Sequence, residues 1–344
     1  MHAKNVERRG REVDKLRFVI AYEGLLNVAS LNLERAAEIR KMPVAFLKED
    51  GEVEFVSEVP AISGVMLKHW HFRNLVELSR EDNDSLCLFC NRLEAIRIPP
   101  RSVQDYYNTS YGGTEKELIE KCVGEDVHGF LVTEEKESLR RESCVRFSWA
   151  IGLPRFSDEY RRIMIVQHTR NISKIPLDAP EELRRLQMPY PRPYASDFYG
   201  FVSIADLSRI GISYTDNLEG IDQNTRKMRQ KNTILAYGRM LQGEIGANLS
   251  RSLPASTPLT VFLAASKRGA IPAPIHPIYP SYLSESTKLI ENAAELFRDE
   301  LRVRIYAPYI DQSTKNHIIS LLGEDPFVDD PYTGLRHIID FLGL

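Results

Sequence analysis

The sequence predicts a mixed α+β fold built on a ferredoxin-like or RRM-type sheet. Strand-like apolar segments alternate with two long helical segments, in the order strand, helix, strands, helix, strand. This β-α-β-β-α-β order buries one face of a sheet under two helices and leaves the other face free. The strand-like segments are 16–26, 143–152, 198–207 and 257–266, and the helical segments are 63–79 and 224–243.

The first helix carries unusual residues in its opening turns. It begins at Ser63 and Gly64, where unsatisfied backbone N–H groups bind anions and glycine permits close approach. Lys68 and His69 follow, although the helix dipole prefers acids there. We therefore expect a phosphate from outside the chain at this helix end. For His69 the alternative is a satisfied core or boundary histidine, since it shares an arc with Phe72.

Two regions interrupt the simple alternation. Residues 80–128 are interpreted as an insertion, with a possible strand at 94–98 and a helix whose Thr114 and Glu117 form a capping box. The proline-rich stretch 174–197 is expected to exclude regular sheet and to form an extended surface excursion.

Composition narrows the class of protein. The 344 residues are 43% hydrophobic, enough for a substantial core. The charged amino terminus and the lack of a long apolar run predict a soluble, cytoplasmic protein. A net charge of −3 argues against a protein that coats nucleic acid through an overall positive charge. Basic clusters nevertheless occur at 224–232 and 155–196. The alternative for each cluster is a solvated face.

The cysteines leave several alternatives open. Cys87 and Cys90 have zinc-ligand spacing, but a second pair is missing. A complete site would need Cys122 together with Cys144 or with a histidine such as His128. Small buried hydrophobic residues, a structural metal and a disulfide all fit the pattern. We assign no metal ligand and expect no cofactor.

Motifs of the common enzyme classes are absent from the sequence. Basic residues, in contrast, recur at places where backbone N–H groups are also expected to be free. The sequence has no Walker A, HExxH, GxSxG or GxGxxG motif and no tight acidic motif of a metal-dependent nuclease. Arg141 and Arg146 accompany the strand at 143–152, and Asn248 and Arg251 lie in a turn of small residues. This pattern predicts contacts with successive phosphates of a nucleic acid.

The order and spacing of several segments resemble the CRISPR-associated autoregulator (DevR) family, the backbone subunit of archaeal type I-A Cascade complexes. The segments are FVIAYEGLLNVASLN, RKMPVAF, VPAISGVMLKHW, CLFC, ELIEKCVGEDVHGFLV, RRESCVRF, VQHTRN and GANLSRSLPAS.

The resemblance implies a division of the chain into an RRM-like palm, a helical insertion and a thumb. The palm would comprise residues 1–64, 129–154 and 197–344, the last with the C-terminal helices. The helical insertion with the CxxC pair would be 65–128. An extended β-hairpin at 155–196 would form the thumb.

The same resemblance implies a non-catalytic subunit that binds CRISPR RNA. Copies would oligomerise along the guide spacer in a Cascade interference complex and present it for pairing with target DNA in antiviral defence. The expected partners are CRISPR RNA, other copies of the chain, other Cascade subunits and, through the guide, target DNA, with no membrane partner. The RNA-binding residues implied by the match are Arg40, Ser63, Lys68, His69, Arg141, Arg146, His168, Arg170, Asn248 and Arg251.

Two alternatives remain at this point. One is a metal-dependent ribonuclease of the same fold, with a loop aspartate such as Asp50, Asp105 or Asp126. The other is a protein-interaction module that binds no RNA.

Overall fold

A computed structural model describes most of the chain. The described residues are 15–31, 33–35, 38–48, 50–111, 113–133, 138–153, 162–168, 178, 180–181, 190–215, 218–247, 249–250 and 252–344. Among them, no helix has both the length and the apolar character needed to cross a membrane.

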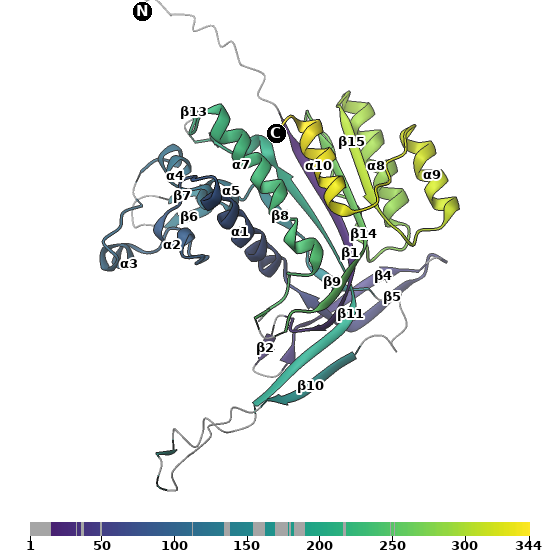
Figure 1. Ribbon diagram of the computed structural model, residues 1–344, viewed down its shortest axis with the longest axis horizontal. Coiled ribbons are helices and arrows are strands. Elements are labelled where there is room, and N and C mark those ends of the chain that lie inside the picture. The colour runs from purple at the N-terminus through teal and green to yellow at the C-terminus, as the bar shows by residue number, and fades with distance from the viewer. Residues whose placement is uncertain are drawn as a thin grey trace, which may run out of the picture.

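One antiparallel sheet of nine strands lies at the centre of the molecule (Figure 1). Its main path runs through β15 (Leu301–Tyr306), β14 (Ala255–Ser266), β1 (Arg17–Ala29), β11 (Tyr190–Asp206), β9 (Ala150–Gly152), β5 (Val53–Ile62) and β4 (Lys41–Leu47). Two further strands, β8 (Val145–Phe147) and β10 (Arg162–His168), also pair with β11. β1 is an interior strand, paired with β11 on one side and β14 on the other.

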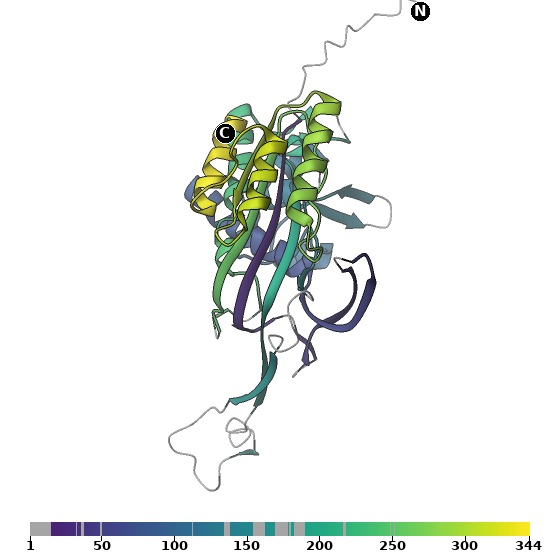
Figure 2. The ribbon, with the colours of Figure 1, turned by 90° about the vertical axis from the view of Figure 1, so that its right-hand side faces the viewer.

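Helices cover both faces of this sheet (Figures 1 and 2). On one face lie α1 (Gly64–Glu81), α7 (Gln223–Leu235) and α10 (Pro331–Leu342), whose apolar residues join one core cluster. On the other lie α8 (Tyr282–Phe297) and α9 (Gln312–Leu322), which contribute to a second cluster. The predicted mixed α+β class is confirmed.

β1 explains why both faces must be covered. Phe18, Ile20 and Tyr22 belong to the first core cluster, whereas Val19 and Ala21 belong to the second, and all five are fully buried. An apolar run without polar alternation is typical of a strand with two covered faces. The expectation that one face stays free is therefore wrong for this part of the sheet.

α1 begins where the sequence predicts. The Ser63 hydroxyl accepts the Met66 N–H at 3.2 Å and caps the helix. Gly64 is required by close packing, because a Cβ there would lie 2.8 Å and 2.9 Å from the carbonyl oxygens of Phe147 and Ser148.

α1 ends at Glu81, so the insertion starts near residue 80, where the residues placed it, and not at residue 65, which the resemblance implies. Leu67 and Leu75 of α1 lie in the first core cluster, so the helix belongs with the sheet. On its outer side lie the short helices and the separate hairpin of the insertion (Figure 1). These elements are α2 (Leu88–Asn91), α3 (Arg101–Tyr106), α4 (Glu115–Lys121), α5 (Val123–His128), β6 (Phe130–Thr133) and β7 (Ser138–Arg141).

Within the insertion one local prediction is confirmed and two are wrong. The capping box of Thr114 and Glu117 is present. No strand forms at 94–98, where Ile98 has a φ of 43° that strands do not adopt. The strands of 129–154 do not form one sheet, because β6 and β7 pair only with each other among the described strands.

A hairpin of β10 and the first part of β11 extends away from the body of the molecule (Figure 1). Pro191 and Pro193 lie inside its regular antiparallel pairing, so the prediction that the prolines exclude sheet is wrong there. Proline is tolerated because the recorded pairing of β11 with β1 ends at Ala195, which leaves this segment as an edge.

The remaining differences concern element ends. α7 is capped by Asp222 instead of Asn224 and ends at Leu235. The strand predicted at 143–152 is divided into β8 and β9. The small elements are β2 (Leu33–Arg35), β3 (Glu38–Ile39), β12 (Ile212–Ser213), β13 (Leu218–Glu219) and the 3-10 turns at Leu207–Arg209 and Arg239–Gln242.

Candidate nucleic-acid interface

A groove with a volume of about 760 Å³ opens beside the N-terminal half of α1. It brings together four of the predicted RNA-binding residues, namely Arg40, Ser63, Lys68 and His69. The other lining residues are Val65, Met66, Phe72, Ala95, Arg97, His128 and Trp149. The groove therefore combines cationic and aromatic side chains from α1, the insertion and two parts of the sheet.

Arg40 reaches the groove from the short link between β3 and β4. Its carbonyl accepts the Ala61 N–H at 3.1 Å, which ties this link to β5. Its guanidinium carbon lies 5.7 Å from the centroid of the Trp149 ring, within the range of a cation–π interaction. The pair forms one wall that offers both charge and an aromatic surface.

Lys68 is a half-buried cation that α1 contributes to the groove. Its ammonium donates to the carbonyl of His128 at 3.1 Å. Burial, and then the nearby charge of Arg97, lowers the pKa of Lys68 to about 8. An anion in the groove would oppose both effects, so this side chain gains from a phosphate close by.

The two histidines of the His-Trp-His sequence point to different environments. Burial lowers the pKa of His69 from its ordinary value, with Arg73 and Arg97 adding to the effect, so the ring is mostly neutral at pH 7. Burial also lowers the pKa of His71 to about 3. His71 Nδ1 lies 3.0 Å from His128 Nε2, and its Nε2 lies 2.9 Å from the Thr233 carbonyl. His71 therefore fastens α1 to α5 and α7 inside the protein.

Arg141 does not contact solvent, which corrects the prediction that it binds RNA. Its side chain is completely buried and forms ion pairs with Glu115 at 2.6 Å and Asp126 at 2.7 Å. It also donates to the carbonyls of Asp126, Arg209 and Ile212 at 2.7–2.8 Å. All five N–H donors of a guanidinium are thus used inside the protein.

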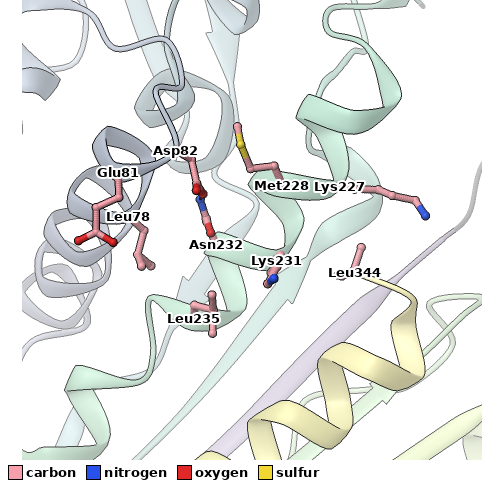
Figure 3. A pocket seen from close by; sticks show the side chains of 9 residues that line it. All are labelled: Leu78, Glu81, Asp82, Lys227, Met228, Lys231, Asn232, Leu235 and Leu344. Carbon is pink, nitrogen blue, oxygen red and sulfur yellow. The ribbon is translucent and has the colours of Figure 1, made fainter.

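The basic run at 224–232 is also divided between interior and surface. Arg226 and Arg229 are buried, and Arg229 pairs with Asp84 at 2.8 Å and Asp126 at 3.0 Å. Lys227 and Lys231 line a different groove of about 440 Å³ between α7 and α1 (Figure 3). The run is therefore not one continuous basic surface.

Two further predicted residues, Arg146 and His168, are not among the residues that line the α1 groove. Arg146 is exposed on β8, on the opposite side of the strand from buried Val145. His168 ends β10, where its Nε2 lies 3.0 Å from the Tyr194 hydroxyl oxygen. The other three, Arg170, Asn248 and Arg251, lie outside the described residues.

Arg97 and Trp149 are groove residues that the sequence reasoning missed. Arg97 lies in the segment predicted as a strand, and its guanidinium carbon is 4.0 Å from the centroid of the Phe72 ring. Trp149 lies at the break between β8 and β9. The sequence predicts one unbroken strand over 143–152, so it gives no signal that sets Trp149 apart.

The fold is that of chains in RNA-guided CRISPR complexes. A chain of a solved "CRISPR RNA-guided surveillance complex, pre-nicking" matches with a TM-score of 0.55 and 11% identity, covering 95% of this chain and 100% of that chain. A chain of a second "CRISPR RNA-guided surveillance complex" matches with a TM-score of 0.50 and 12% identity, covering 95% and 99%. At these identities the likeness concerns the fold alone.

Comparison with related sequences identifies the protein family. A family model described as "CRISPR-associated negative auto-regulator DevR/Csa2" matches residues 20–287. The Cas7/Cst2/DevR protein of Methanocaldococcus jannaschii is 34% identical over 284 residues, which are 79% of this chain and 87% of that protein. The corresponding protein of Thermoproteus tenax is 28% identical over 68% of this chain and 70% of its own length. The chain belongs to the CRISPR-associated DevR/Csa2 family, which confirms the resemblance seen in the sequence.

Proposed function

We propose that this protein is a non-catalytic backbone subunit of a type I-A Cascade complex and that the α1 groove binds the backbone of CRISPR RNA. The observation that carries the proposal is the gathering of Arg40, Lys68 and Trp149 in one groove of a DevR/Csa2 family chain. Cations attract phosphates without regard to sequence, and an aromatic face accepts any base. Such contacts leave sequence recognition to pairing between the guide and target DNA.

An RRM-like palm is part of this proposal. The adjacent strands β14, β1, β11 and β8, with α1 and α7 on one face, support it because their connectivity is β-α-β-β-α-β. The covered second face directs RNA to the edges and loops of the sheet. The α1 groove lies at such an edge, beside the link before β4 and the break after β8.

The exposed apolar residues of the hairpin support a contact between neighbouring copies of the protein. Ile163, Met164, Ile165 and Val166 of β10 are 39%, 65%, 58% and 39% exposed. Four consecutive exposed apolar residues are typical of a surface that another protein covers. We propose this hairpin as the thumb that contacts the next copy along the RNA.

The ribonuclease alternative has little support in the described residues. Asp126 is fully buried and paired with Arg141 and Arg229. Asp50 and Asp105 are exposed but do not line the groove. Bound RNA that stays intact in Mg²⁺ or Mn²⁺ is the expected result, and specific cleavage would favour the nuclease.

The proposal is tested by purifying the chain from cells that express a CRISPR array and measuring the mass and RNA content of the product. We expect discrete assemblies that contain small RNA of uniform length and dissociate at high salt. An RNA-free monomer that also ignores added CRISPR RNA would contradict the proposal and favour the protein-interaction module.

Met164→Glu is expected to shorten these assemblies without lowering the melting temperature of the RNA-free protein. A charge on the exposed side of β10 would oppose burial against a second copy but touches no core cluster. Leu296→Glu is the matched control, since Leu296 is 75% exposed on α8. Equal effects of the two substitutions on the assembly mass would exclude a special role for the hairpin.

The affinity for single-stranded RNA is expected to fall as the pH rises from about 8 towards 10. The pKa of Lys68 is about 8 in the free protein, and a bound phosphate raises it, so binding takes up a proton above that pH. Below pH 8 both states carry the proton, and Lys68 adds no pH dependence. Lys68→Gln should remove most of this decline in affinity with pH. Arg40→Gln should weaken binding at every pH but retain the decline. An unchanged pH profile in Lys68→Gln would exclude Lys68 from the interface.

A further inference from the structure

The insertion contains a cluster of potential metal ligands that are not among the residues lining the α1 groove. Cys87 precedes α2, Cys90 lies in α2, Cys122 lies between α4 and α5, and Glu125 lies in α5. Their three sulfur atoms and one carboxylate oxygen all lie within 4.8 Å of one another. The structure thus supplies the two further ligands that the CxxC motif lacks in the sequence.

The spacing of these atoms fits a tetrahedral ion. In a zinc site, two sulfurs are about 3.8 Å apart and a sulfur and an oxygen about 3.6 Å apart, from the usual bond lengths. Glu125 Oε1 lies 3.8 Å from both Cys87 Sγ and Cys90 Sγ. The Cys90 N–H also points to Cys87 Sγ at 3.5 Å, a contact that stabilises a thiolate. Small side-chain movements would suffice to complete the coordination.

Burial makes the cluster costly without a cation. Cys90, Cys122 and Glu125 are at most 1% exposed. Within the described part of the chain, Glu125 Oε2 is buried without a hydrogen-bond partner. A buried carboxyl group in this position is destabilising unless a partner satisfies it. A metal ion bound by the carboxylate would offset that cost.

The surroundings suit an anionic set of ligands. Arg97 Nη1 lies 3.2 Å from Cys90 Sγ, so a guanidinium faces the sulfurs from outside. Three thiolates, one carboxylate and Zn²⁺ together carry a net negative charge, and the positive charge of Arg97 would offset part of it. Gly124 keeps space beside the site, since a Cβ there would lie 2.6 Å from Cys90 Sγ. A cavity of about 220 Å³ lined by Cys87, Cys122 and Glu125 provides an entry path.

We propose that Cys87, Cys90, Cys122 and Glu125 bind one Zn²⁺ in a closed structural site. Thiolates select zinc among the common divalent ions, and four protein ligands leave no open position for catalysis. The ion would join α2 to the α4–α5 pair. Cys90 and Cys122 pack with Phe72 and Val76 of α1, so the same ion would hold the insertion against the helix that forms the groove.

Cys144 offers a matched comparison within the chain. It is as buried as Cys122, but its recorded partner is the Asp126 carbonyl at 3.6 Å. It is not part of the cluster. A Cys→Ser substitution at either position removes one buried thiol, and only the substitution at 122 removes a proposed ligand.

The test is elemental analysis of the full-length protein purified with zinc in the medium and dialysed against a weak chelator. We expect one zinc per chain in the wild type and in Cys144→Ser, and at least tenfold less in Cys122→Ser. Loss of zinc from both variants, or its absence from the wild type, would overturn the proposal. A Cys87–Cys90 disulfide, detected as the loss of two hydrogens in the mass of the intact chain, would also overturn it.

Cobalt substitution of the wild-type chain keeps the test decisive if Cys122→Ser fails to fold. Co²⁺ is expected to give thiolate-to-metal charge-transfer absorption and the intense visible bands of tetrahedral coordination. Glu125→Gln should retain the charge-transfer bands but alter the visible ones, because only the oxygen ligand changes. Cobalt spectra without thiolate bands would contradict the assignment even with zinc present in the preparation.

Discussion

Arg141→Met is expected to lower the free energy of unfolding by about 3–5 kcal/mol, the cost of removing one partner of a buried ion pair. The substitution leaves Glu115 and Asp126 buried without the guanidinium that pairs with both. It also removes the guanidinium donors from three backbone carbonyls. Chemical denaturation of the RNA-free protein measures the effect.

The control is an ion pair at the surface. Arg239 pairs with Glu77, and their side chains are 56% and 31% exposed. Arg239→Met should cost about 0–1 kcal/mol, since solvent screens such pairs. A similar loss for the two variants would show that the buried network around Asp126 does not stabilise the fold in the way we describe.

Trp149→Ala is expected to weaken the binding of single-stranded RNA by about 1–3 kcal/mol, as for the loss of one base-stacking side chain. The loss should be similar for RNAs of different sequence, because every base has an aromatic face. Arg40 loses its cation–π partner in the same variant, which adds to the effect. Fluorescence anisotropy at fixed salt gives the affinities.

Two further substitutions at this position separate binding from folding. Trp149→Phe retains a ring and should recover much of the affinity, whereas Trp149→Leu retains apolar volume and should bind like the alanine variant. Wild-type affinity in Trp149→Leu would show that the ring does not stack on a base. A loss confined to certain RNA sequences would contradict backbone recognition by the groove.

Local signals in the sequence predicted the beginning of α1 well. A cap and a close approach involve residues near one another, so Ser63 and Gly64 marked the helix end. The groove could be predicted only in part. Lys68 and His69 share α1 with its first residues, but Trp149 and Arg97 reach the groove from distant segments. Their positions depend on how the strand breaks after β8 and on where the insertion folds back.

Arg141 shows why an arginine is hard to interpret from its neighbours. Its acidic partners are Glu115 and Asp126, which come from other elements, and the carbonyls it uses belong to Arg209 and Ile212. Nothing in the local sequence separates such a residue from a phosphate-binding one. The covered second face was not predicted, although the consecutive apolar positions of β1 carry that signal.

The position of β1 between β11 and β14 has a consequence for synthesis of the chain. β1 is made first but pairs with β11 and β14, and the end of β14 lies about 240 residues later. At translation rates of about 5–20 residues per second, this separation corresponds to on the order of 10–50 s. During that time the nascent chain carries an apolar strand that lacks at least one of its two partners. We expect the yield of folded protein to depend on temperature and chaperones during translation, even if the finished fold is stable.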